Sequence, residues 1–431
     1  STRPLLGRKG SLSVGFIFLC QITLLICFQP GRPDHQSLLI FLFAVSIGFM
    51  LRMIIKPFSI RLCYVAGAVS ALSMWVNVES IVPVGITIGV LSLLWLWEDN
   101  EFLDKSLHYI LALFVATGLS LVLERAWHNL LAEEYDRLSI VHFSVFGFIT
   151  VLWITLFVLN RKMQIFRRRA NRFLSISIGL AMLAFTIFAS FPKFYKGPFA
   201  DIDPRIVRLW LGNVAEMQPL LSRSGHLAVS VQLIGSVIIS LAFFIYLLFW
   251  STQREDLRGW IYISLMVTVF TFLALVMYRW SYYAQAVVVI PMAELMNRTL
   301  AWYKHPSNKL LTAGRNILIK MTFILGLLSL GIAADIIFNS DVRSYRRISM
   351  IPICEYLNKA GKWQEQELRI LTHIDFGEEI LYRTRHEVIG TPTATGTSHR
   401  NGQGISDTFD IMTAETDEKA LELIRKRNID L

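Results

Sequence analysis

Charge is scarce in this chain. Only 17% of its 431 residues are Asp, Glu, Lys or Arg, whereas 54% are hydrophobic, and the mean hydropathy is +0.50. A water-soluble globule of this length covers its surface with more charge than that. The composition therefore excludes an ordinary soluble protein and predicts a polytopic membrane protein.

Cysteine is scarce too, with four residues in the whole chain. Cys20, Cys27 and Cys63 lie in or beside apolar runs and Cys354 stands alone, so nothing in the cysteine pattern indicates a disulfide framework or a zinc site. No solenoid repeat and no cleavable signal peptide is evident. The sequence begins without Met, and its last residues, 425–431, read as a helix entering a strand. We therefore expect both ends to be cut.

What the chain has in abundance is apolar runs of about 17–24 residues, the length needed to cross a bilayer. About eleven spans are predicted, near residues 12–28, 37–54, 62–78, 80–98, 106–123, 141–159, 172–191, 227–250, 260–278, 281–297 and 317–338. The expected fold class is mainly α, a helical membrane domain over residues 1–338.

Lys and Arg gather in loops that all fall on one side of the membrane if the spans alternate. These loops are 52–61, 161–172, 251–259 and 298–316. Because cytoplasmic loops keep positive charge, the net charge of +10 indicates topology and not a nucleic-acid partner. The opposite, outer face then receives the turn at 30–36, the loop at 192–226 and everything after residue 338.

The last quarter of the chain has a different pattern. Residues 369–373 and 387–390 read as strands, and residues 355–363 and 417–428 read as helices. We predict a truncated, extracytoplasmic α/β domain over residues 339–431. Within it, residues 391–406 are rich in Thr, Gly and Ser and are expected to form a loop.

A polar turn, PGRPDHQ at residues 30–36, lies between the first two predicted spans. A carboxylate near the hydrocarbon edge is costly unless it is solvated, paired or bound to a cation. Asp34, His35 and Gln36 can present oxygen and nitrogen ligands together, as Mg²⁺ or Mn²⁺ prefers. The alternative is a solvated hairpin tip.

The longest outer loop carries a second polar cluster. Asp201, Asp203, Arg205 and Arg208 are followed by Glu216, and long ordered loops between spans tend to be functional. An interfacial amphipathic helix over residues 204–212 is the alternative for the first part of the cluster. That alternative leaves Glu216 free to act.

Residues 213–219, NVAEMQP, resemble the Ser-Val-Ser-Glu-His-Gln-Pro signature of the catalytic subunit of oligosaccharyltransferase, a GT-C membrane glycosyltransferase. In that family the signature follows the ninth of thirteen spans, and here it follows the seventh of about eleven. The resemblance implies a fragment without the first two spans and without an acidic residue that the family's first external loop supplies. Such a fragment is expected to be inactive alone.

The same offset places Asp34 at the leading metal-binding Asp of the family's second external loop. Gln36 departs from the family pattern, which has an acid or a histidine there. Asp375-Phe376-Gly377 resembles the end of the family's Trp-Trp-Asp-Tyr-Gly, but His373 and Ile374 replace the two tryptophans that help the family recognise the acceptor Ser or Thr. Arg279 corresponds to an arginine that holds the phosphate of the lipid-linked donor.

These matches imply a membrane glycosyltransferase that moves a glycan from a polyprenyl-(pyro)phosphate donor to an acceptor protein or glycan on the outer face of a bacterial inner membrane. The catalytic candidates are Asp34 and Glu216, and the metal ligands for Mg²⁺ or Mn²⁺ are Asp34, Gln36 and Glu216. The substrate-binding candidates are His35, Gln218, Arg279 and Asp375.

Two alternatives remain open from the sequence. One is a GT-C transferase that modifies a lipid or a surface polysaccharide, which the replacement of the tryptophans favours. The other is a lipid or polysaccharide transporter with acids along a substrate path. Three further outer groups, Glu79, the run 134–137 and the pair Asp201/Asp203, have no assigned motif and read more simply as solvated or salt-bridged interfacial groups.

Overall fold

The protein is described from a computed structural model. The structure describes residues 2–28, 35–98, 100–163, 165–200, 204–221, 227–250, 254–302, 309–338, 349–359, 366–391 and 402–431. Contacts divide the chain into two compact units. The first consists of Ser1–Trp127, His142–Ala189 and Ala215–Val342, and the second of His128–Val141, Ser190–Val214 and Arg343–Leu431. The domain boundary expected after residue 338 stays a prediction.

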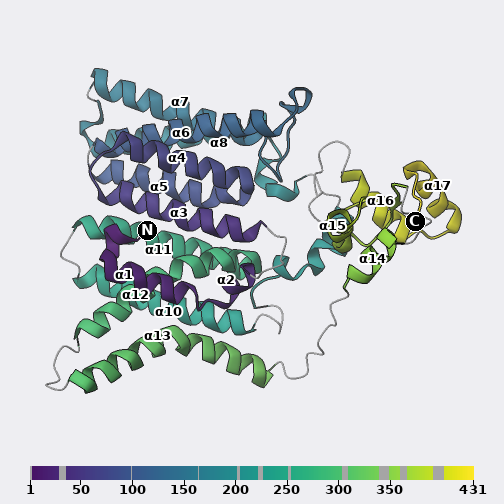
Figure 1. Ribbon diagram of the computed structural model, residues 1–431. Helices are drawn as coiled ribbons and strands as arrows, with labels where there is room; N and C mark the ends of the chain where they lie inside the picture. The colour runs from purple at the N-terminus through teal and green to yellow at the C-terminus, as the bar shows by residue number, and fades with distance from the viewer. Residues whose placement is uncertain are drawn as a thin grey trace. The chain divides into compact units, whose positions relative to one another are not determined.

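The first unit is a helical bundle. Its helices are α1 (Arg3–Phe18), α2 (Ile22–Cys27), α3 (Gln36–Ile55), α4 (Ile60–Val76), α5 (Ile81–Trp97), α6 (Glu101–Glu124), α7 (Ile140–Met163), α8 (Arg169–Ser190), α10 (Leu227–Trp250), α11 (Arg254–Val276), α12 (Ser281–Trp302) and α13 (Lys309–Phe338). Short 3₁₀ turns, η1 (Val78–Ser80), η3 (Ile165–Arg167), η6 (Ala215–Met217) and η8 (Tyr278–Trp280), lie beside them. In Figure 1 these helices lie side by side, from α7 and α8 at the top to α13 at the bottom.

Each predicted apolar run after the first falls on one helix. Among the described residues, seven helices are long and apolar enough to cross a membrane. These are α3, the stretch Val78–Trp97 that contains α5, α6, α7, α8, the first part of α10, and α11 from Leu257 onward. Few side chains of α8 are buried inside the bundle, as expected for a helix whose apolar surface faces lipid, whereas α12 is buried along most of its first half. The multi-pass helical fold predicted from the sequence is thereby confirmed.

The first predicted span differs from expectation. Residues 12–28 read as one continuous run, but helix α1 already begins at Arg3 and ends at Phe18, and α2 begins only at Ile22. A break frees backbone groups that need partners in an apolar setting. The amide Nε2 of Gln232 on α10 donates to the freed carbonyl oxygen of Cys20 at 3.1 Å, and Gln285 on α12 donates to Gln232 at 3.5 Å.

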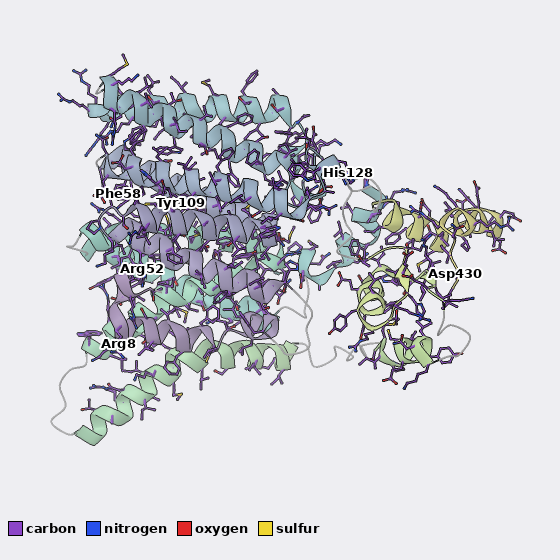
Figure 2. The ribbon with its side chains drawn as sticks, turned by 45° about the horizontal axis from the view of Figure 1, so that its top comes forward. Arg8, Arg52, Phe58, Tyr109, His128 and Asp430 are labelled. Carbon is purple, nitrogen blue, oxygen red and sulfur yellow. The ribbon has the colours of Figure 1, made fainter. Side chains whose placement is uncertain are left out.

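Helices α4 and α6 approach each other closely at Gly67. A Cβ at this position would lie 2.3 Å from the carbonyl oxygen of Tyr109, so only glycine permits this backbone approach. Tyr109 is fully buried in this contact, and its hydroxyl donates to Ser70 Oγ at 2.9 Å. Figure 2 shows Tyr109 among the side chains inside the bundle.

The second unit contains a small α/β core. Strands β1 (Arg369–Ile370) and β2 (Glu387–Val388) are parallel, with Arg369 opposite Glu387. Its helices are α9 (Pro204–Leu209), α14 (Ile351–Lys359), α15 (Ile374–Arg383), α16 (Gly402–Met412) and α17 (Asp417–Arg427). The 3₁₀ turns η4 (Phe194–Phe199) and η5 (Leu211–Asn213) also belong to it, and η2 (Trp127–Asn129) lies at the boundary between the units. The last residues continue beside β1, because the backbone N–H of Leu371 donates to the carbonyl oxygen of Leu431 at 2.8 Å.

The prediction of a loop over residues 391–406 is wrong for its last five residues. Residues 392–401 lie outside the described residues, but 402–406 form the first turn of α16. Ile405, Thr408 and Ile411 recur at helical spacing and are buried. Their burial on one face outweighs the polar composition that suggested a loop.

Replacing Gly67 by Leu is expected to lower the free energy of unfolding by about 1–3 kcal/mol, because the side chain must separate two packed helix backbones. Thermal unfolding of the detergent-solubilised protein measures this. Gly85→Leu on α5 is the matched control, since a Cβ there meets nothing within 4 Å. Equal melting temperatures for the two variants would contradict the close approach of α4 and α6.

Candidate functional site

Four segments of the first unit meet at one end of its helices. They are residues 35–36 at the start of α3, residues 77–80 between α4 and α5, residues 215–218 around η6, and residues 278–283, which run from η8 into α12. Side-chain and backbone hydrogen bonds join them, as described below. We call this group of four segments the end cluster.

The carboxylate of Glu216 is held at both oxygens. Gln36 Nε2 donates to Oε2 at 3.0 Å, and the Tyr282 hydroxyl donates to Oε1 at 3.0 Å. Gln36 is buried, and its own Oε1 accepts from the Cys27 thiol at 3.6 Å. Thus the polar turn and the Val-x-Glu-x-Gln-Pro stretch meet, although 180 residues separate Gln36 from Glu216.

Gln218 contributes its backbone to the same cluster. The backbone N–H of Tyr278 donates to the carbonyl oxygen of Gln218 at 2.7 Å. This bond fixes η6 against η8 and so places Glu216 beside the start of α12. The role of Gln218 in binding substrate stays a prediction.

Arg279 forms an ion pair with Glu79 inside the end cluster. Arg279 Nε lies 2.8 Å from Glu79 Oε1, and both side chains are about five-sixths buried, with exposed fractions of 16% and 15%. The Tyr283 hydroxyl donates to the other oxygen, Glu79 Oε2, at 3.5 Å. Glu79 is therefore salt-bridged, as the simpler interpretation of the sequence expected, but its partner is a candidate substrate-binding residue.

His35 reaches the same link through Asn77. His35 Nε2 and Asn77 Nδ2 are 3.1 Å apart, and Asn77 Oδ1 accepts from the backbone N–H of Glu79 at 2.9 Å. The Asn77 amide therefore joins His35 to the turn that carries Glu79. The polar turn is thus tied to two other segments, through His35 and through Gln36.

Asp34 lies outside the described residues, so its role as a metal ligand together with Glu216 stays a prediction. Its chain neighbours His35 and Gln36 both point into the end cluster through the bonds given above. Tyr282, Tyr283 and Asn77 are the cluster members to which the sequence analysis gave no role. For Tyr282 and Tyr283, the sequence signal that could have identified them is that two adjacent tyrosines follow Arg279 at the start of a predicted span.

The described part of the end cluster does not by itself fit a metal ion. Gln36 turns its NH₂ group, not its oxygen, toward Glu216, so these two predicted ligands are hydrogen-bonded to each other. Within the described ranges, no three His, Cys, Asp or Glu side chains are grouped as a cation would require. The amide of Gln36 would have to turn over to serve as a ligand with Glu216.

Asp375 belongs to the second unit, at the start of α15. Its Oδ1 accepts from the indole Nε1 of Trp210 at 3.0 Å, and its Oδ2 lies 3.6 Å from His373 Nδ1. Trp210 is buried, whereas Asp375 and His373 are about half exposed. An indole from the loop 190–214 therefore fixes the carboxylate of the Asp-Phe-Gly stretch.

Close packing explains why residue 377, the last of the Asp-Phe-Gly stretch, is a glycine. A Cβ at Gly377 would lie 2.5 Å from the carbonyl oxygen of Gly390. The closeness lets α15 pack against the segment that follows β2. Asp375-Phe376-Gly377 is therefore constrained at its last position by the core and at its first by Trp210.

Ion pairs also occur in the run 134–137 and at Arg205 of the second polar cluster. Arg137 Nε lies 2.7 Å from Glu134 Oε2. Arg205 Nη1 on α9 lies 3.1 Å from Asp410 Oδ1 on α16, and this pair is largely exposed. Asp201 and Asp203 lie outside the described residues.

No protein-family model and no curated protein sequence matches the chain. Solved structures do match it. The oligosaccharyltransferase AglB of the archaeon Archaeoglobus fulgidus, in complex with an inhibitory peptide and a dolichol-phosphate, aligns with a TM-score of 0.67 and 14% identity over 98% of this chain and 56% of its own. The apo form of an Archaeoglobus fulgidus oligosaccharyltransferase gives a TM-score of 0.65 and 13% identity over 99% and 57%.

A third structure is that oligosaccharyltransferase tethered by a disulfide bond to an acceptor peptide with the NVT sequon. It gives a TM-score of 0.61 and 13% identity over 98% of this chain and 56% of its own. The fold is thus that of a GT-C membrane protein. More particularly, it is the fold of the solved archaeal oligosaccharyltransferases, which confirms the oligosaccharyltransferase-like fold that the resemblance in the sequence predicted. The chain spans just over half the length of these structures.

The contact between residues 36 and 216 can be tested without an activity assay. Cysteines placed at both positions in a Cys27→Ala background should be joined by a short bifunctional thiol reagent, and mass spectrometry should detect the linked peptide. Cys27 is removed because it contacts Gln36.

The matched control pairs Gln36→Cys with Glu294→Cys, twelve residues beyond Tyr282 on α12 and therefore about 18 Å further along the helix. Linkage of the control pair, or failure to link residues 36 and 216 in folded protein, would contradict the end cluster.

Proposed function

We propose that the chain is part of a GT-C glycosyltransferase that moves a glycan from a polyprenyl-(pyro)phosphate donor to an acceptor on the outer face of the membrane. The observation that carries this proposal is the hydrogen bond between Gln36 and Glu216. It unites the two stretches of sequence that resemble the catalytic motifs of oligosaccharyltransferase, within a chain that has that protein's fold.

The solved neighbours support the kind of substrate. One of them holds a dolichol-phosphate and an inhibitory peptide, and another holds an acceptor peptide. A lipid-linked donor and a peptide acceptor are therefore reasonable substrates in general terms. For this chain, the lipid-linked donor and the acceptor are proposed substrates, and neither the sugar nor the acceptor molecule is assigned.

Glu216 is assigned to orienting the acceptor nucleophile. Gln36 and Tyr282 each donate to one carboxylate oxygen, and an ionised carboxylate accepts at both oxygens in this way. Because the carboxylate is already fixed, little reorganisation is needed when the acceptor arrives. An acceptor amide or hydroxyl placed beside Glu216 could donate its hydrogen there while it attacks the anomeric carbon.

Arg279 is assigned to the phosphate of the donor. Sugar transfer expels the lipid (pyro)phosphate, and a guanidinium can offer two parallel N–H groups to phosphate oxygens. Arg279 is largely buried beside Glu79, where electrostatic interactions are stronger than in bulk water. The resemblance further implies inversion at the sugar carbon.

A divalent cation, Mg²⁺ or Mn²⁺, remains part of the proposal through Asp34, on the basis of the sequence alone. The residues described do not present a ligand set, so the roles given to Glu216 and Arg279 above do not depend on a metal. A cation bound by Asp34 would supply Lewis-acid neutralisation of the departing phosphate.

A second acceptor class is favoured by one observation. His373 and Ile374 stand where the oligosaccharyltransferase family has two tryptophans, and the carboxylate of Asp375 accepts a hydrogen bond from the indole of Trp210. An acceptor site altered in this way suits a lipid or surface-polysaccharide acceptor better than a protein sequon. Comparing sequon peptides with glycan acceptors in one transfer assay distinguishes the two classes.

The proposed location is a cell membrane, with residues 339–431 outside the cytoplasm because the basic loops lie on the other side. The apolar helices support a multi-pass membrane protein. The solved neighbours come from an archaeon and give no support to the bacterial inner membrane that the sequence suggested.

In the intact protein, Glu216→Gln is expected to lower the rate of transfer by at least about 10², the usual scale for a lost catalytic electrostatic or acid/base group. Transfer from a radiolabelled lipid-linked donor measures this. Glu124→Gln, at an exposed carboxylate at the end of α6, is the matched control and should retain full activity. A fully active Glu216→Gln protein would remove Glu216 from the mechanism.

Asp34→Asn changes the side-chain volume little but removes the charge that a cation needs, so transfer should fall steeply. Chelation of divalent cations should abolish transfer by the wild type, and Mg²⁺ or Mn²⁺ should restore it. If metal-free protein transfers at the full rate, Asp34 is to be reassigned from metal ligand to base.

A further inference from the structure

Glu79 has a more defined position than an interfacial ion pair requires. It lies in η1, and its backbone N–H is held by Asn77 Oδ1 at 2.9 Å. Asn77 in turn contacts His35. The turn that carries Glu79 is therefore fixed by the polar turn before α3, and not only by its own helices.

Both carboxylate oxygens of Glu79 are engaged by neighbours from η8 and α12. Arg279 Nε lies at Oε1 and the Tyr283 hydroxyl at Oε2. Tyr283 is itself fixed by aromatic packing, because its ring stacks on Phe270 at 5.1 Å and meets Phe43 edge-on at 5.0 Å. The orientation of the carboxylate is thus determined on two sides.

Stability alone is a weak reason for this ion pair. Removing two charges from water costs several kcal/mol per ion, and apolar replacements of buried pairs are often neutral or stabilising. A buried pair that includes a candidate binding residue, Arg279, therefore calls for a second explanation. The atoms in contact supply one.

The contact to Glu79 is made through Nε of Arg279. It engages one of the five N–H donors of the guanidinium and restricts how the group can turn. Phosphate recognition by arginine requires two parallel donors in a fixed orientation. A guanidinium whose plane is set before the ligand arrives loses less entropy on binding.

We propose that Glu79 is a positioning residue for the lipid donor. It holds the Arg279 guanidinium in the plane that binds the phosphate headgroup of a polyprenyl phosphate. The proposal rests on the proposed function, because that function assigns Arg279 to the donor phosphate. It adds Glu79, together with Tyr283, to the donor-binding part of the end cluster.

The test measures binding of a polyprenyl monophosphate to the intact protein in nanodiscs of zwitterionic lipid. Polyprenol without phosphate and free inorganic phosphate serve as comparison ligands. Wild-type protein that binds the lipid phosphate no better than polyprenol would overturn the proposed function itself. Binding that inorganic phosphate competes away fully would show a free-phosphate site and overturn the lipid assignment.

Glu79→Ala is expected to weaken binding of the polyprenyl phosphate about tenfold and to raise the KM for the lipid-linked donor more than it lowers kcat. Glu79→Gln should restore most of the affinity, since its amide oxygen still accepts from Nε. If Glu79 merely neutralised Arg279, both variants would bind the phosphate more tightly than the wild type. Unchanged or tighter binding in Glu79→Ala overturns the proposal.

The exchanged pair Glu79→Arg with Arg279→Glu separates positioning from folding. It preserves an ion pair, so the melting temperature should stay near that of the wild type, but binding of the polyprenyl phosphate should be lost, because residue 279 no longer carries a guanidinium. Recovery of phosphate binding in the exchanged protein would show a purely structural ion pair and contradict the proposal.

The matched control exchanges Glu98 and Arg258, which also form an ion pair, between the end of α5 and α11. Both side chains are partly buried, at 26% exposed, and neither belongs to the end cluster. Exchange of this second pair should leave polyprenyl phosphate binding unchanged. A loss there as large as at Glu79 and Arg279 would assign the effect to the fold of the bundle.

Discussion

The hydrogen bond from Gln36 to Glu216 is the contact on which the rest of the candidate site depends. A carboxylate at the edge of an apolar bundle is costly unless donors surround it. Gln36 satisfies one of its oxygens and Tyr282 the other. Because the donors come from α3 and α12, satisfying this carboxylate requires the polar turn, η6 and the start of α12 to converge.

The start of α12 serves two carboxylates at once. Tyr282 and Tyr283 are adjacent, and successive side chains on a helix point about 100° apart, so each hydroxyl reaches a different acid. Tyr282 donates to Glu216 and Tyr283 donates to Glu79. The two acids are thereby held on one helix end, next to Arg279, where an anionic donor and an acceptor could be brought together.

The second unit shows how an altered motif is still held in place. The Asp-Phe-Gly stretch keeps its glycine, because Gly377 approaches the Gly390 carbonyl too closely for any side chain. Its aspartate is fixed by the indole of Trp210, although the two preceding tryptophans of the family are replaced. The Asp-Phe-Gly stretch is thus constrained at both ends by contacts within the second unit.

The sequence by itself determined the helical membrane fold. In lipid, every backbone N–H and C=O group must be hydrogen-bonded within the protein, and a long apolar run satisfies this requirement by forming a helix. The sequence also predicted the strands near Arg369 and Glu387, where alternation is local. It did not predict the break between α1 and α2. The carbonyl oxygen of Cys20 accepts a hydrogen bond from Gln232, more than two hundred residues away. A continuous apolar run contains no signal for such a distant contact, so the break could not be predicted from it.

Motif spelling identified Glu216, Arg279 and the polar turn as candidates, but only the tertiary structure decided what they contact. Glu79 forms its ion pair with Arg279 across 200 residues of chain, and Gln36 faces Glu216 with its NH₂ group. Hydrogen-bond partners at such separations follow from how the helices pack. Periodicity and composition report burial along one segment and carry no information about which distant segment will lie beside it.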